Sequence, residues 1–144
     1  MAVTYTKVAF PKIEERLRNI INEEFKNVYI SSRFENMGSD ESIRIFTSSS
    51  NLLEHTQYSE VREYTVSVRH YYNEPDSIRR EEYVKNRIDR LKKLIMGNIS
   101  SAGNYYDLHI DGIQYDVQDV ENENNPDMHI TELEAMLKNY NKWS

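Results

Sequence analysis

The chain has 144 residues, a formal net charge of −6 at neutral pH and no cysteine, and 38% of its residues are hydrophobic. This length predicts a single domain over residues 1–144, whose folding buries roughly 70% of the surface that the unfolded chain exposes. The lack of cysteine excludes a disulfide scaffold, thiolate catalysis and cysteine-ligated zinc, and the acidic balance argues against nucleic-acid binding by counterion release. No stretch approaches the roughly 18 apolar residues of a membrane span, and the first residues lack the apolar segment of a signal peptide, so we expect a soluble protein made without export.

The first part of the chain predicts a helix followed by strands. Pro11 suits the first turn of a helix, and apolar residues then recur at helical spacing as far as Phe25. Turn-forming residues precede an alternating apolar pattern that is typical of a strand. The expected elements are an extended arm over residues 3–8, a helix over 11–25, a strand over 28–30, a turn over 36–40 and a strand over 43–47.

The middle of the chain combines an irregular stretch with the clearest strand pattern. Residues 48–58 show no clean period, and we expect a long loop that inserts Leu52 and Leu53 into apolar surroundings. Residues 63–72 alternate between two faces and predict a strand at the centre of the sheet. His70 lies on the apolar face of that strand, where a hydrogen-bonded core or interface histidine is expected rather than a catalytic base.

A second helix and a hairpin are predicted next. Pro75 and Asp76 end the strand and supply an N-cap, and apolar residues at steps of three and four predict a helix over about 77–96 that ends near Gly97. Asp111 and Gly112 form a strong type I′ turn signal. A hairpin at that turn places Asp107 opposite Asp116.

The last segment, residues 129–143, fits two structures. Thr131 and Glu134 form a possible capping box for a helix, whereas the same residues also alternate as in a strand. The fold class expected is α+β, with two helices packed on one mainly antiparallel sheet. The element order is helix, strands, helix, hairpin and a final element.

The sequence contains none of the common catalytic motifs, but one cluster of Asp and His residues is a candidate site. There is no glycine-rich phosphate loop, no His-Glu-x-x-His and no Gly-x-Ser-x-Gly. Asp107, His109, Asp111 and Asp116 are expected on one hairpin face. This cluster fits an exposed polar face, a surface covered by Lys or Arg of a neighbouring subunit, or a divalent-metal or proton-sharing site.

Charge is distributed unevenly along the chain. Residues 79–93 contain seven bases and three acids, whereas residues 104–137 contain nine acids and neither Lys nor Arg. Solvated helix and hairpin faces explain this pattern, as does a subunit with one positive and one negative side that makes head-to-tail contacts in a ring. The eleven tyrosines fit either ordinary strand propensity or an interface.

Taken together, the order of elements resembles the tail terminator or tail-completion (neck) proteins of tailed bacteriophages. A charged helix, an Asp111-Gly112 turn, an acidic stretch over 121–127 and a closing segment follow the residues that carry the resemblance. Those residues are Ile43-Arg44-Ile45-Phe46, Ser49-Ser50-Asn51-Leu52-Leu53-Glu54, Val61-Arg62-Glu63-Tyr64-Thr65-Val66 and Tyr71-Tyr72.

The resemblance implies a non-enzymatic virion protein. Proteins of this family form a ring, usually of six subunits, at the head-proximal end of the tail tube, where they end tube polymerisation and join the tail to the head connector. The implied partners are further copies of the chain, the tail tube protein, the connector or stopper protein and a sheath protein. DNA passes the lumen without specific binding, no membrane or cofactor is involved, and assembly takes place in the host cytoplasm. The resemblance also makes the final segment a strand.

Two sets of residues follow as candidate contacts, with no catalytic, cofactor or metal residue assigned. Other functions left open are a different neck protein, such as a head-completion stopper, and a small metal-dependent enzyme that uses Asp107, His109 and Asp116. The expected ring interface pairs Arg87, Arg90 and Lys93 with Asp107, Asp116 and Asp119. The expected tube and connector contacts are Asn36, Met37, Asn51, Leu52, Leu53 and Glu54.

Overall fold

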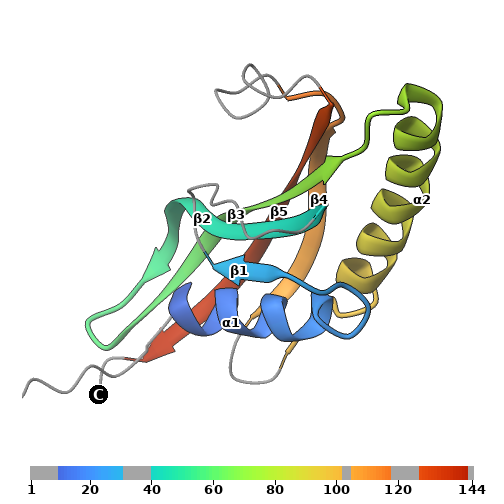
Figure 1. The fold of residues 1–144 in the computed structure, drawn as a ribbon. Coiled ribbons are helices and arrows are strands. Elements are labelled where there is room, and N and C mark those ends of the chain that lie inside the picture. Colours follow the sequence, from blue (N-terminus) through green and yellow to red (C-terminus); the bar gives the residue numbers. More distant parts are fainter. Residues whose placement is uncertain (1–9, 31–39, 102–104, 118–126, 143–144) are drawn as a thin grey trace, which may run out of the picture.

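The computed structural model describes residues 10–30, 40–101, 105–117 and 127–142. These residues form an α+β fold in which two helices pack on one five-stranded sheet of order β1-β2-β3-β5-β4 (Figure 1). Only β1 with β2 is a parallel pair, and the predicted fold class is therefore confirmed. The elements are α1 (Phe10–Ile21), β1 (Val28–Ile30), β2 (Glu41–His55), β3 (Ser59–Asn73), α2 (Ser77–Met96), β4 (Tyr106–Gln114) and β5 (Met128–Lys142).

One face of the sheet forms the main core with both helices. The central strand β3 points Val66 and Val68 to this face, where each is 0% exposed, and the predicted alternation of that strand is confirmed. Leu17 of α1 and Leu91 of α2 are also fully buried in the same cluster. Burial of such side chains is the main stabilising contribution to a domain of this size.

The two helices follow local signals in the sequence. In α2, Asp76 is the N-cap, since its carboxylate accepts hydrogen bonds from the backbone N–H groups of Ile78 (3.0 Å) and Arg79 (3.1 Å). Gly97 caps the other end, and its backbone N–H donates to the carbonyl of Lys93 at 2.9 Å. The predicted second helix is therefore confirmed, and α1 ends at Ile21, earlier than predicted, with Phe25 still buried beyond it.

Residues 48–58, which we expected to be a long loop, belong to a long β-hairpin instead. Strand β2 continues to His55, and β3 begins at Ser59, so only three residues form the turn. Bulges between Thr47 and Ser49 and between Leu52 and Glu54 interrupt the register. Each bulge adds a residue and breaks the period of two, which explains why the pattern looked irregular. We call residues 48–58, which are all exposed, the hairpin tip.

The hairpin predicted at Asp111 and Gly112 is also wrong. Strand β4 runs through both residues and pairs with β5 along its length, with a register shift between Ile110 and Gly112. Because of this shift Ile110 and Ile113, three residues apart, both pack against the core. A two-residue turn and a bulge produce the same break in alternation, and here the bulge forms.

The final segment is a strand, as the resemblance implied. Strand β5 lies between β3 and β4 and pairs with all 15 residues of β3, from Ser59 with Lys142 to Asn73 with Met128. Its alternate residues Leu133, Ala135 and Leu137 are 0% exposed in the core. Pairing with a strand on each side buries β5, and this burial outweighs the small intrinsic preference of its residues for a helix. The capping-box signal is therefore not realised.

The face of the sheet away from the helices is also largely buried. Tyr71 is 1% exposed and Ile130 0% exposed in a second small cluster. Arg44, also 1% exposed, lies with its guanidinium 4.5 Å from the centre of the Tyr29 ring. Within the described ranges, no helix is long and apolar enough to span a membrane. The expected arm over residues 3–8 lies outside the described residues, as does the expected acidic stretch over 121–127 except for its last residue, Asp127.

Candidate assembly surfaces and a buried charge cluster

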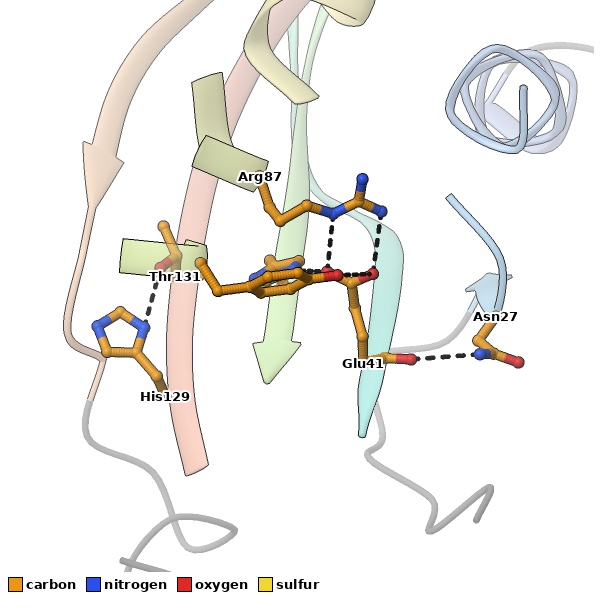
Figure 2. Close-up of polar contacts among 7 residues, drawn as sticks. Asn27, Glu41, Arg87, His129 and Thr131 are labelled. Carbon is orange, nitrogen blue, oxygen red and sulfur yellow. Dashed lines mark hydrogen bonds and ion pairs between the residues drawn. The ribbon is translucent and has the colours of Figure 1, made fainter. Parts of the chain in front are cut away.

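A cluster of polar side chains around Glu41 connects α2 to the sheet (Figure 2). Glu41 begins β2, and Arg87 of α2 binds both of its carboxylate oxygens, with Nε 3.1 Å from Oε2 and Nη2 3.0 Å from Oε1. On β3, Nε2 of His70 lies 2.7 Å from Oε2, and the Tyr83 hydroxyl of α2 lies 3.3 Å from Oε1. Three elements of the fold therefore converge on one carboxylate.

The surroundings of the cluster hold Glu41 in its ionised form. Burial alone raises the pKa of Glu41, but the hydrogen bonds from His70 and Arg87 outweigh it and lower the pKa to about 2. An ionised carboxylate only accepts hydrogen bonds, so His70 donates through Nε2. His70 is 0% exposed, and its interpretation as a hydrogen-bonded core histidine is confirmed.

Aromatic rings enclose the same cluster. The guanidinium of Arg87 lies 3.9 Å from the centre of the Phe25 ring, a close cation–π contact. Tyr83 stacks on Tyr72 with the ring centres 4.2 Å apart. The cluster therefore fixes the position of α2 by charge, hydrogen bonding and packing together, and we assign it a structural role.

A groove lies beside the N-terminal half of α2, near His129. Its lining includes Val84 and Ile88 of α2, Tyr115 after β4 and His129 of β5, and its volume is about 500 Å³. Burial lowers the pKa of His129, which keeps the ring neutral at neutral pH. The Thr131 hydroxyl lies 3.3 Å from Nδ1 of His129 (Figure 2). The groove is lined by these apolar and aromatic side chains together with three charged ones, Glu81, Lys85 and Asp89.

Three of the expected ring-interface residues have partners within their own subunit. Arg87 binds Glu41 as described, Arg90 forms a two-point ion pair with Glu24, and the Asp107 carboxylate lies 2.9 Å from Nζ of Lys138. The same contacts lower the pKa of Glu24 and of Asp107. Their pairing across subunits stays a prediction.

The remaining expected ring residues are Lys93, Asp116 and Asp119. Lys93 and Asp116 are exposed, and Lys93 is the last basic residue of α2. Asp119 lies outside the described residues. The structure therefore places one exposed cation of the expected pair on α2 and one exposed acid beyond the end of β4.

The expected tube and connector contacts lie at one end of the molecule as far as they are described. Asn51, Leu52, Leu53 and Glu54 are all in the hairpin tip, and the two leucines are each 46% exposed. The expectation that these leucines insert into apolar surroundings is therefore wrong. Asn36 and Met37 lie outside the described residues.

The acidic cluster predicted on a hairpin face does not form as expected. Asp107 and Asp116 are not cross-strand partners, because β4 pairs with β5 and not with itself. Asp107 has a φ of 56°, in the left-handed region, within a register shift of β4, and its backbone oxygen lies 3.1 Å from Nδ1 of His109. Over the described ranges, no group of three or more His, Asp or Glu side chains could hold a metal ion.

Sequence reasoning missed two features of these surfaces. Glu41 follows a turn and carries no motif, and only its pairing across β2 and β3 brings it to His70. Tyr140, 57% exposed, lies opposite Val61 at the same end of the sheet as the hairpin tip. An exposed tyrosine in a strand was the available signal, because tyrosine is enriched at interfaces. No protein-family model matches the chain, and no curated protein sequence matches it significantly.

Proposed function

We propose that this chain is a non-enzymatic structural protein of a tailed bacteriophage that forms a ring at the head-proximal end of the tail tube. The ring ends tube polymerisation and joins the tail to the head connector. The resemblance of residues 43–72 to tail terminator proteins suggests this role, and the α+β fold is the one that the resemblance implies. A final strand in place of a helix adds support.

The observation that carries the proposal is the hairpin tip. Beyond the three residues that pair with β1, strand β2 continues for ten residues, and those from 48 onward are exposed. Figure 1 shows this hairpin reaching well past the helices, at lower left. It presents Leu52, Leu53 and Tyr58, the last 60% exposed. Exposed apolar side chains on a projecting element are typical of a surface that contacts another protein.

The mechanism proposed is binding alone. A contact between two different surfaces of the same chain closes into a ring when its rotation divides the circle. One face of the ring then contacts the last layer of tail tube subunits, and the other face contacts the connector. Tube polymerisation stops because the ring does not present the surface that a further tube subunit binds. The proposed partners are copies of the chain, the tail tube protein, the connector and, in a contractile tail, the sheath.

Native mass spectrometry of the purified chain over a series of protein and salt concentrations tests the proposal. We expect a closed oligomer near six subunits whose population falls as salt rises, because part of the contact is electrostatic. A monomer at every protein concentration contradicts ring formation. A stoichiometric metal bound to that monomer favours an enzyme instead.

A further inference from the structure

One edge of the long hairpin is open over most of its length. In the sheet order β2 lies between β1 and β3, and β1 pairs only with residues 43–45 of β2. Among the described residues, no strand continues along that side of β2 beyond residue 45, although β2 runs to His55 and is exposed from Ser48 onward. We call this side of residues 48–55 the open edge. Its backbone N–H and C=O groups are of the kind that an added strand binds.

Beyond β1, the next backbone group on this side is bound by α1 instead of by a strand. The N–H of Ile43 donates to the carbonyl of Asn27 at 3.0 Å, so alternate residues of β2 point their N–H groups to this side. Thr47, four residues on, donates its backbone N–H (2.8 Å) and its hydroxyl (3.1 Å) to Oε2 of Glu14 in α1. Glu14 is only 8% exposed. Helix α1 therefore lies against β2 at the point where the open edge begins.

The chain enters α1 from the side of the open edge. Phe10 begins α1 four residues before Glu14, a distance of about 6 Å at roughly 1.5 Å for each residue. Figure 1 shows the first, darkest turn of α1 on the side of the hairpin, with the helix running away from it. The residues that precede Phe10 therefore reach the helix close to Thr47. Eight extended residues span roughly 26 Å, which is also the length of the eight residues of the open edge.

The residues that precede α1 have a composition typical of a strand. Five of the eight residues 2–9 are β-branched or aromatic, and none is glycine or proline. Lys7 is the one charged side chain among them, and Glu54 is the one on the open edge with histidine counted as neutral. Pairing of the two segments therefore brings no like charges together. The sequence of residues 2–9, which lie outside the described residues, suits an edge strand.

We infer that residues 2–9 add to the open edge of their own chain as a further strand. A segment that ends at Phe10 beside Thr47 and extends toward His55 runs antiparallel to β2. Main-chain hydrogen bonds then give β2 a neighbour on both sides, and the open edge no longer offers a template for edge-to-edge aggregation. The leucines of the hairpin tip stay exposed, because side chains of a strand point to the faces of the sheet and not to its edge. The inference concerns a single chain and is independent of the proposed ring.

Cysteine crosslinking tests the pairing directly, because the chain has no cysteine of its own. Thr6→Cys is combined with Ser50→Cys in one variant and with Asn51→Cys in another, since adjacent residues of a strand face opposite sides. Mild oxidation of the dilute protein is expected to form a disulfide within one chain in at least one variant, because opposed residues of antiparallel strands lie close enough for it. The product is a faster-migrating monomer on a non-reducing gel. Its absence from both variants overturns the pairing.

The matched control combines Thr6→Cys with Lys92→Cys, an exposed position on α2. We expect no disulfide within the chain from this variant. An equal yield from the control reveals random collisions and overturns the pairing. Covalent dimers in place of the faster-migrating monomer show that the segment pairs with a second copy, which overturns the same-chain pairing as well.

Hydrogen exchange measures the pairing without cysteine. Thr4→Pro together with Tyr5→Pro removes two neighbouring N–H groups, one of which faces β2 in the paired strand, and Thr4→Ala with Tyr5→Ala is the matched control. The proline variant is expected to raise the exchange rate of the outward-facing amides among residues 48–55 about tenfold, and the alanine variant about twofold or less. Amides of β4 are expected to be unchanged in both variants, which shows that the fold is kept. A proline variant that exchanges like the wild type or like the alanine variant overturns the pairing.

Discussion

Replacement of Glu41 by Gln is expected to destabilise the protein in a way that depends on pH. The pKa of Glu41 falls from the ordinary value of 4.5 to about 2 in the folded state. The pKa is thus lowered by about 2.5, and a lowering of 1 corresponds to roughly 1.36 kcal/mol. The ionised carboxylate therefore contributes at most about 3.4 kcal/mol to the free energy of unfolding. Solvent reaches part of the carboxylate and screens these interactions, so we expect about 2 kcal/mol at pH 7.

The pH dependence follows from the direction of the shift. Because the folded pKa lies below the unfolded pKa, the stabilisation is fully present above about pH 4.5 and is lost as the pH falls toward 2. The Gln variant has no such titration. The difference in free energy of unfolding between wild type and variant is therefore expected to narrow to about half by pH 3.

Urea denaturation followed by circular dichroism, at pH 7 and at pH 3, measures both quantities. Glu81→Gln is the control, because Glu81 forms an exposed pair with Lys85 on the same helix as Arg87. We expect the control to change stability by less than about 0.5 kcal/mol. A Glu41→Gln variant as stable as the control at pH 7, or one with an unchanged pH dependence, refutes the role of the cluster.

Three further variants test the fold by the same denaturation measurement at pH 7. Leu91→Ala empties a fully buried position of α2, and a loss of about 3 kcal/mol is expected; a loss under 1 kcal/mol contradicts its burial. Asp76→Ala removes two N-cap hydrogen bonds, with an expected loss of about 1 kcal/mol, whereas Asp76→Ser keeps most of the stability. Asn27 has a φ of 56°, so Asn27→Ala is expected to be about 1 kcal/mol less stable than Asn27→Gly, and equal stabilities rule out this conformation.

The elements that follow from the sequence are those whose signals are local and repeated. The helix α2 has an N-cap at Asp76, an apolar stripe and a C-cap at Gly97, and all three agree on its bounds. Strand β3 alternates over residues 63–72 because it carries no bulge itself: its pairing with β5 is continuous, and the bulges in its pairing with β2 lie on β2. Several independent signals agree for each of these elements, and the predictions of α2 and β3 were therefore correct.

The elements that were predicted wrongly are those in which bulges interrupt the alternation. The bulges of β2 near Ser49 and Leu53 hide a strand behind an irregular pattern. The bulge of β4 near Asp111 gives Ile110 and Ile113 the spacing of a two-residue turn. A bulge depends on the partner strand, which lies far away in the sequence. The local pattern alone therefore cannot separate a bulge from a loop or a turn.

The candidate surfaces were predictable only in part for the same reason. The resemblance pointed to residues 51–54, which the structure shows exposed on the hairpin tip. The charges proposed for the ring interface were chosen from a basic and an acidic stretch of sequence. Composition does not reveal that Arg87 binds Glu41 and Arg90 binds Glu24, since those partners are 46 and 66 residues away.

Cryo-electron microscopy of the purified chain tests the proposed ring most directly. We expect class averages of a closed ring of about six subunits around a lumen. Isolated subunits, or compact dimers with two-fold symmetry, contradict the ring and the head-to-tail contact on which it depends.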